Sequence, residues 1–374
     1  MHVETLDLLA FRNISHAHLE LNPGFNVFYG ANAQGKSNLL EALYTLAFLK
    51  GFRAPRSEDL IEFDHEKAQL AAVIQNESAR TRLSLELAPK SRRVYIDGMP
   101  CARVRDYLGI LRAILFTPSD VAILQNAPAE RRTALDRMVF NLRPAYLLDL
   151  EQYQKICKQK SALLRSESPD QNLLDVYDAQ ILPVALKLIT ARYRYLELLA
   201  PYVTQIFAQI FDNAIDCQIS YKCASFRNDI QFGPQNSASL EDVIQVYTHH
   251  HQTARAQELA SQQIRVGPHR DDWSVRLNGR PARMFASQGQ QRAISLAIKM
   301  AEITCLRKEA GIEPIFLLDD VSSELDPVRH KKLFDTLNSL TTQAFLTTTS
   351  RNHVPIDSIG RLFRVDAGSI THEP

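Results

Sequence analysis

The sequence predicts an α/β fold in which both chain ends form sheets and a helical segment is inserted between them. Three observations predict this. A short apolar run, Phe25–Tyr29, leads through a glycine loop into helical spacing over 38–49. A second apolar run, 314–318, has the continuous hydrophobicity of a buried parallel strand. Between them, 120–259 consists of long polar–apolar stretches with almost no glycine.

The N-terminal part, 1–116, is expected to form half-buried antiparallel sheet. Apolar residues alternate with polar ones over 17–21 and again over 83–87, the period of a strand with one face in the core. Asp97-Gly98 signals a tight hairpin, and 111–116 is expected to form another buried strand. We assign 1–116 to the first half of the sheet-forming unit.

The middle, 117–263, is expected to be an all-helical insertion or arm. Its main helices are predicted at 130–140, 146–165, 173–199 and 202–212. Pro144, a polar turn at 166–172 and Pro201 are the predicted breaks, and short turns favour antiparallel helix neighbours.

The C-terminal part, 264–374, returns to α/β character and completes the sheet-forming unit. A hairpin with an Asn278-Gly279 turn is expected to lead into a helix that starts near Gly289. A buried strand at 314–318, a helix at 327–340 and a final strand at 344–348 follow.

The loop after the first apolar strand has the spacing G-x-x-x-x-G-K-[ST] and predicts a phosphate-binding loop. Glycines let backbone N–H groups close on phosphates, Lys36 can reach the β and γ phosphates, and Ser37 can ligate Mg²⁺. The loop alone names no reaction, because kinases, motors, GTPases and transporters all carry one. The predicted nucleotide-binding residues are Gly30, Ala31, Asn32, Ala33, Gln34, Gly35, Lys36 and Ser37.

The second buried strand ends in two carboxylates, Asp319 and Asp320. We expect Asp319 to bind Mg²⁺ with Ser37, and Asp320 to act with Lys36 as a catalytic residue by orienting the attacking water. Many buried strands end in an Asp that caps the next helix. The two aspartates alone would not distinguish a helix cap from a catalytic site, but their occurrence together with a phosphate loop favours the catalytic interpretation.

The composition is that of an ordinary soluble protein of 374 residues, long enough for two domains. The five cysteines are scattered and suggest neither disulfides nor a zinc site, so a reducing cytoplasm is expected. Neither a signal peptide nor a membrane-spanning apolar run is seen.

A formal net charge of +1 means that any DNA partner would be held by local basic patches. Arginines at 90–105, with Arg53 and Arg56, could form a DNA-facing surface or merely charged, solvated hairpins.

Two motifs resemble those of the ATP-binding-cassette (ABC) class of ATPases. Ser287-Gln-Gly-Gln290 resembles its signature loop and Ser323-Glu-Leu-Asp326 its D-loop. A helix that opens here would point N–H groups and its positive end at an anion. Together with the phosphate loop and twin aspartates, Leu9-Ala-Phe-Arg-Asn13 and Gly267-Pro-His-Arg-Asp-Asp272 resemble the RecF family of DNA-repair ATPases.

This resemblance implies an ABC-type ATPase head built from both chain ends, a short helical arm, and ATP and Mg²⁺ as cofactors. It implies that Arg12 contacts phosphate and that the class's Q-loop glutamine lies within 116–125. It also implies that a second copy's γ-phosphate meets Ser287, Gln288, Gly289 and Gln290.

The resemblance further implies an ATP-dependent homodimer that clamps DNA near single-strand/double-strand junctions. Weak, DNA-dependent ATP hydrolysis would act as a switch. RecR and RecO would be partners in loading RecA during repair, replication and the SOS response.

The competing interpretation is the ATPase subunit of a membrane ABC transporter. Such subunits usually carry Glu at the position of Asp320 and a His after the last core strand, where this chain has Thr347-Thr-Thr349. Those departures and the long insertion disfavour it. A small-molecule kinase would leave the motif at Ser287 unexplained.

The group His269, Arg270, Asp271 and Asp272 has two equally weighted interpretations. It could bridge the nucleotide site and a dimer interface, or it could be a buried, ion-paired turn that orients the following hairpin.

Overall fold

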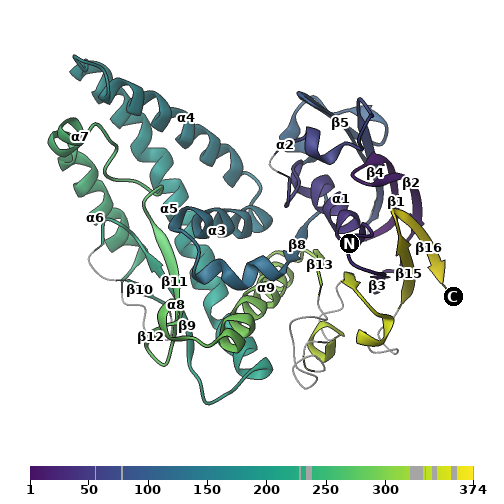
Figure 1. The fold of residues 1–374 in the computed structure, drawn as a ribbon. Helices are drawn as coiled ribbons and strands as arrows, with labels where there is room; N and C mark the ends of the chain where they lie inside the picture. The colour runs from purple at the N-terminus through teal and green to yellow at the C-terminus, as the bar shows by residue number, and fades with distance from the viewer. Residues whose placement is uncertain are drawn as a thin grey trace. The chain divides into compact units, whose positions relative to one another are not determined.

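The computed structural model describes residues 1–54, 56–76, 79–226, 229–232, 238–320, 332, 334–338, 343–354 and 360–373. The chain divides into two compact units. Unit 1 comprises Met1–Asp120 and Glu302–Pro374, so it holds both the purple and the yellow end of the chain in Figure 1. Unit 2 comprises Val121–Ala301.

The first sheet of unit 1 is antiparallel, with strand order β2-β1-β4-β5-β6-β7. Burial alternates along β5, where Leu83, Leu85 and Leu87 are buried as the sequence pattern predicts. The β6–β7 turn is the predicted one at Asp97-Gly98, with both residues at positive φ. The strands are β1 (His2–Phe11), β2 (Ile14–Glu20), β4 (Ala68–Gln75), β5 (Arg80–Ala88), β6 (Ser91–Ile96) and β7 (Met99–Pro100).

The second sheet of unit 1 joins both chain ends, in the order β16-β15-β3-β14-β13-β8. Neighbouring strands from β15 to β8 pair in parallel, and only β16 is antiparallel to its neighbour. The strands are β3 (Phe25–Tyr29), β8 (Ala113–Phe116), β13 (Ile315–Leu318), β14 (Ala344–Thr348), β15 (Arg361–Asp366) and β16 (Ser369–Glu373).

Helix α1 (Lys36–Phe48) is the centre of the unit 1 core. The predicted apolar face, Leu39, Ala42, Leu43 and Leu46, is fully buried, and so is Leu40. One apolar cluster joins this helix to residues of both sheets. A helix buried on nearly all sides must begin where the sheets place it, which fixes the loop before it. The short elements of unit 1 are η1 (Glu58–Leu60), α2 (Val104–Tyr107) and η4 (Arg351–His353); η2 (Pro118–Leu124) crosses the boundary.

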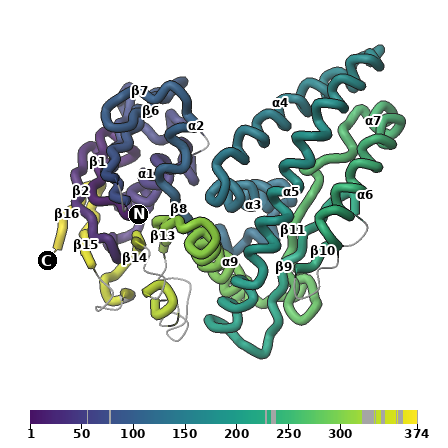
Figure 2. Tube along the Cα trace, turned by 180° about the vertical axis from the view of Figure 1, so that it is seen from behind, coloured from purple at the N-terminus to yellow at the C-terminus, as the bar shows by residue number. Residues whose placement is uncertain are grey.

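Unit 2 contains a long helical hairpin of α4 and α5, which run side by side in Figures 1 and 2. Helix α5 contains both Pro183 and Pro201, so the predicted break at Pro201 is wrong. Proline removes a single helix N–H, and the buried neighbours Leu199, Ala200 and Val203 hold the helix through it. The helices are α3 (Pro128–Leu142), α4 (Tyr146–Leu164), α5 (Gln171–Ile210), α6 (Leu240–Thr253), α7 (Arg255–Ser261), α8 (Ala282–Phe285) and α9 (Gln288–Ala310), the last of which continues into unit 1.

Unit 2 also contains an antiparallel sheet, so the predicted insertion 117–263 is not all-helical. Strand β9 (Cys217–Lys222) lies between β10 (Ile230–Gln231) and β11 (Asp272–Leu277), and β12 (Arg280–Pro281) follows through the predicted Asn278-Gly279 turn. All of 264–301 belongs to unit 2, where β11 pairs with β9, whereas the sequence interpretation placed these residues with the head. Strand pairing across fifty residues leaves no local sequence signal.

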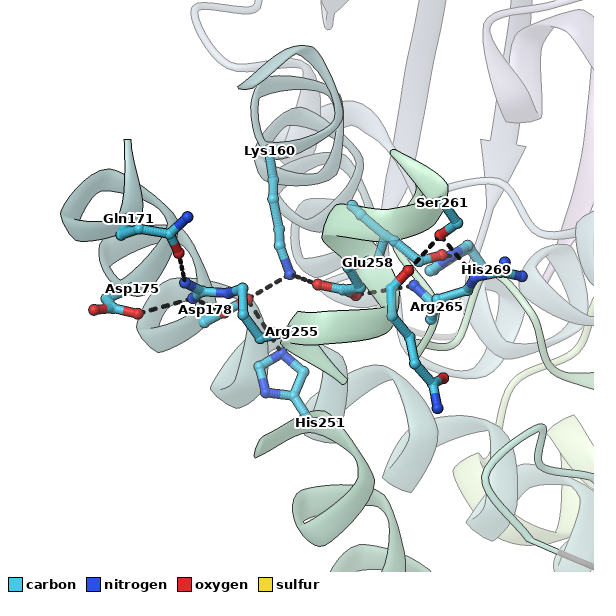
Figure 3. A network of polar contacts seen from close by, with 12 residues as sticks. Lys160, Gln171, Asp175, Asp178, His251, Arg255, Glu258, Ser261, Arg265 and His269 are labelled. Carbon is cyan, nitrogen blue, oxygen red and sulfur yellow. Dashed lines mark hydrogen bonds and ion pairs between the residues drawn. The ribbon is translucent and has the colours of Figure 1, made fainter. Parts of the chain in front are cut away.

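A buried polar network ties α4, α5 and α7 together (Figure 3). Lys160, whose side chain is 2% exposed, donates to Asp178 and to Glu258. Arg255 adds ion pairs to Asp175 and Asp178. A buried ammonium requires such partners, so the network fixes the register of these helices.

Candidate nucleotide-binding site

The carboxyl ends of the parallel strands in unit 1 bring the predicted phosphate loop and twin aspartates to one edge. The loop follows β3, Asp319 follows β13, and β14 lies between these strands and pairs in parallel with both. Ligands of open α/β sheets bind outside this edge. The predicted order of strand, loop and helix is observed.

The loop backbone needs its glycines. A Cβ atom at Gly30 would lie 2.2 Å from the carbonyl oxygen of Val365. Gly35 has φ 108°, and a Cβ there would lie 2.6 Å from Asn13 Oδ1. Helix α1 starts at the next residue without a side-chain cap, so its positive end opens at the loop. This is the local geometry of an anion-binding site.

Neighbouring hairpins hold the tip of the loop. The backbone oxygen of Gln34 accepts from Asn13 Nδ2 at 3.1 Å and from the Gly368 N–H at 2.9 Å, and its Oε1 accepts from the Ala367 N–H at 2.6 Å. No local pattern indicates that the β15–β16 turn reaches this loop. The contacts of this turn with Gln34 hold the phosphate loop in its conformation.

Lys36 spans the loop. Its Nζ donates to the carbonyl oxygens of Gly30 at 2.8 Å and Ala31 at 2.7 Å. Burial lowers the pKa of Lys36 below its ordinary value, while Asp320 and Asp319 oppose that change. The cation is thus held where a phosphate above the loop would need it.

The two predicted metal ligands meet directly. Ser37 Oγ donates to Asp319 Oδ1 at 2.6 Å, and Thr347 Oγ1 donates to the same oxygen at 2.8 Å. Arg53 pairs with Asp319 Oδ2. Asp319 is 2% exposed. Hydroxyl and carboxylate oxygens are the ligands that Mg²⁺ prefers, so the side chains of Ser37 and Asp319 are suited to bind that ion.

Two arginines named in the sequence analysis make ion pairs within unit 1. Arg12, the expected phosphate contact, pairs through its guanidinium with Glu41, which is fully buried on α1. Arg53, grouped above with a DNA-facing surface, lies against Asp319, and its backbone N–H donates to Glu41 Oε1 at 2.9 Å. Sequence reasoning missed Glu41 because a charged residue on an apolar helix gives no hint of its partners.

Asp320, the predicted water-orienting residue, adopts a left-handed backbone with φ 51°. Its N–H donates to Thr347 Oγ1 at 2.8 Å. The left-handed conformation is uncommon outside glycine, although Asp and Asn adopt it more readily than other residues.

The signature-like motif lies in unit 2, at the start of α9. The Ser287 N–H donates to Gln290 Oε1 at 2.8 Å, and the Gln290 N–H lies 3.3 Å from Ser287 Oγ. This reciprocal pair is a capping box, which uses the S-x-x-Q spacing of the motif. Ser287 and Gln288 are exposed, whereas Gly289 and Gln290 are partly exposed.

The D-loop motif, 323–326, lies outside the described residues. Gln125, within the expected Q-loop segment, donates to Gln291 Oε1 at 3.1 Å.

The group at 269–272 is an ion-paired turn of unit 2 in which Asp271 is buried, His269 and Asp272 are partly exposed and Arg270 is exposed. Asp271 accepts from Tyr221 OH at 2.5 Å and from the Ala224 N–H at 2.9 Å, and burial raises its pKa. Asp272 pairs with Arg131 through both carboxylate oxygens. His269 contacts Tyr153 OH at 2.6 Å, and burial lowers the pKa of His269 to about 4. These contacts favour the second interpretation, a turn that holds β11 in place.

Among the described residues, no helix combines the length and the apolar character needed to cross a membrane.

Comparisons with known proteins agree over nearly the whole chain. The family described as the RecF/RecN/SMC N-terminal domain matches residues 2–370. The DNA replication and repair protein RecF of Geobacter sulfurreducens is 35% identical over 373 residues, which cover 99% of this chain and 100% of that protein. RecF of Streptococcus equi subsp. zooepidemicus is 34% identical, covering 99% and 98%.

Solved structures show the same relationship. The recombination mediator protein RecF with ATP, described as part of the RecFOR pathway, matches with a TM-score of 0.88 and 27% identity over 100% of this chain and 98% of that one. The Smc head domain of Pyrococcus furiosus, with a TM-score of 0.58 and 16% identity over 100% of this chain and 96% of that one, shares the fold alone. The expected ABC-type head with a helical arm is confirmed, and the chain belongs to the RecF family of DNA replication and repair proteins.

Proposed function

We propose that this protein binds Mg²⁺–ATP at the edge of the parallel sheet in unit 1 and uses it to control binding to DNA. One observation carries the proposal: Lys36, Ser37 and Asp319 meet around a helix start that is shaped by glycines. The structure of RecF with ATP matches this chain over its whole length. That match supports ATP as the nucleotide. Ser37 and Asp319 would hold Mg²⁺, which would supply positive charge to offset that of the phosphates.

Hydrolysis is proposed to be slow. Asp320 would orient the attacking water, but an aspartate side chain is one methylene shorter than the glutamate usual in transporters and reaches that water less readily. Lys36 would stabilise charge on the β and γ phosphates. A weak, DNA-dependent ATPase of this kind suits a switch better than a motor.

The exposed start of α9 supports a role for ATP in dimerisation. Ser287, Gln288, Gly289 and Gln290 would meet the γ-phosphate held by a second copy, so that ATP closes two chains into a clamp. We place this clamp on gapped DNA near single-strand/double-strand junctions, in the cytoplasm. RecR and RecO are proposed as partners that help load RecA in repair, replication and the SOS response.

The alternative, an ATPase subunit of a membrane transporter, has little support. The chain matches a RecF protein over 99% of its length, and Asp320 differs from the glutamate usual in transporters.

Two variants separate nucleotide binding from dimerisation. Lys36→Ala should weaken binding of a fluorescent ATP analogue about 10- to 100-fold, because it removes a charge-assisted contact. Ser287→Arg should bind ATP normally but lose ATP-dependent binding to a labelled gapped duplex, because bulk at an exposed position blocks only a second copy. Lys67→Ala, at an exposed ion pair with Glu86, is the matched control and should behave as wild type. Wild-type DNA binding by both test variants would refute the proposal.

A further inference from the structure

Thr347 is a buried hydroxyl between the two aspartates of the site. It is fully buried near the carboxyl end of β14. Its Oγ1 donates to Asp319 Oδ1 and accepts the backbone N–H of Asp320, both at 2.8 Å. One hydroxyl thus contacts a carboxylate oxygen of the first aspartate and the backbone of the second.

Strand pairing explains why this residue lies there. β13 and β14 are parallel, with Leu318 opposite Leu346, so the next pair along the register is Asp319 and Thr347. Opposed residues of adjacent strands point to the same face of a sheet. The branched Cβ of threonine restricts χ1, which presets the direction of the hydroxyl.

The contact with Asp319 limits how its carboxylate can turn. Oδ1 receives two hydroxyl donors, one from Ser37 and one from Thr347, in a place where the aspartate is 2% exposed. Removing Thr347's hydroxyl would leave Ser37 as the hydroxyl partner of that oxygen among the described residues. Arg53 would still pair with Oδ2, but Oδ1 would have one hydroxyl donor fewer, so the carboxylate could turn away from Ser37 more readily.

The contact with Asp320 supports its left-handed backbone. With φ at 51°, Asp320 adopts the left-handed conformation, which is uncommon outside glycine but is more accessible to Asp than to most residues. A hydrogen bond to its N–H from a rigid strand favours that conformation, which sets the direction of the side chain.

We propose that Thr347 is a positioning residue for the Mg²⁺–ATP site, where one hydroxyl holds Asp319 toward Ser37 and fixes the backbone of Asp320. The inference rests on the proposed function, since it assigns Thr347 a part in metal binding and turnover at the same site. Its loss affects how Mg²⁺ supports nucleotide binding, but leaves the phosphate loop's own contacts intact.

Thr347→Val tests this, because valine keeps the shape and loses the hydroxyl. Binding of a fluorescent ATP analogue is titrated with Mg²⁺, and kcat, KM and the thermal midpoint are measured. Thr347→Val should raise the half-saturating Mg²⁺ concentration about tenfold and lower kcat about tenfold, consistent with a lost bond to a charged group. Affinity in EDTA and KM in excess Mg²⁺ should stay within about twofold.

Two further variants provide the controls. Thr347→Ser keeps the hydroxyl and should retain wild-type Mg²⁺ dependence. Thr348→Val removes the neighbouring hydroxyl, which donates to the Ser350 carbonyl at 3.1 Å, and should also be near wild type.

The outcomes are distinguishable. Wild-type Mg²⁺ dependence in Thr347→Val, or the same shift in Thr347→Ser or Thr348→Val, overturns the inference while the proposed function stands. A fall in thermal midpoint alone would mean that Thr347 is only structural. Absence of Mg²⁺-dependent ATP binding in the wild-type protein would overturn the proposed function, and this inference with it.

Discussion

Glu41 is a fully buried carboxylate that organises two arginines beside the nucleotide site. It pairs with the Arg12 guanidinium, and its other oxygen accepts the backbone N–H of Arg53. Glu41→Gln would remove the charge that compensates Arg12 in a largely buried setting. We expect a loss of roughly 2 kcal/mol of stability, measured by urea unfolding.

The control for this change is Glu58→Gln. Glu58 pairs with Arg56 where both side chains are largely exposed, at 48% and 75%. Exposed pairs contribute little, so stability should change by less than about 0.5 kcal/mol. Equal effects of the two substitutions would contradict the role given to Glu41.

His269 predicts how stability depends on pH. Burial lowers its pKa from 6.5 to about 4, so the folded protein keeps it neutral while the unfolded chain takes up a proton below pH 6.5. The contribution of His269 to the free energy of unfolding therefore falls as the pH decreases from 6.5 toward 4. At pH 5 the free energy of unfolding is lower by about 2 kcal/mol. His269→Gln should flatten that slope in unfolding experiments at pH 7 and pH 5. An unchanged difference between the two pH values would contradict the prediction.

At this scale, residues were predictable where the motif is local. Gly30, Lys36 and Ser37 lie in one short segment with a fixed spacing, and in the structure that segment joins β3 to the start of α1. Arg53 and Asp319 are separated by 266 positions, so no local pattern reveals their ion pair. Glu41 and Thr347 were not predicted for the same reason.

At the scale of elements, Lys160 on α4 connects the α4–α5 hairpin to α7 through its ion pairs with Asp178 and Glu258 (Figure 3). Lys160→Met would leave Glu258, with a side chain 3% exposed, without its ammonium partner, and should cost about 3 kcal/mol. Adding Glu258→Gln should recover part of the lost stability, because the double variant no longer has an unpaired buried carboxylate at position 258. Urea unfolding of both single variants and the double variant measures the coupling.

Lys187→Met is the control on α5. Lys187 is 59% exposed and lies 3.7 Å from Asp149, so its loss should change stability by less than about 0.5 kcal/mol. Strict additivity of the Lys160 and Glu258 substitutions would show that the network is not coupled.

Elements defined by local chemistry were predicted well. The turns at Asp97-Gly98 and Asn278-Gly279 and the apolar face of α1 depend on neighbours in sequence. Helix α5 was divided wrongly at Pro201 because tertiary packing outweighed the local preference of proline. Strand β9 was missed because its identity depends on pairing with β11.

At the scale of the whole molecule, both chain ends build one unit, as predicted, but its boundaries lie at Asp120 and Glu302. Helix α9 starts in unit 2 with the signature-like motif and continues into unit 1. The phosphate loop belongs to unit 1 and Ser287 to unit 2. ATP-dependent pairing of two copies is the central proposal drawn from this arrangement and from the family.

Light scattering tests that proposal most directly. The mass of the pure protein would be measured without nucleotide, with ADP and with ATP, each in Mg²⁺ and with or without a gapped duplex. The mass should double only with ATP, together with DNA binding, and Ser287→Arg should stay monomeric. A wild-type monomer under every condition would contradict the clamp and remove the proposed role of Ser287 and Gln290.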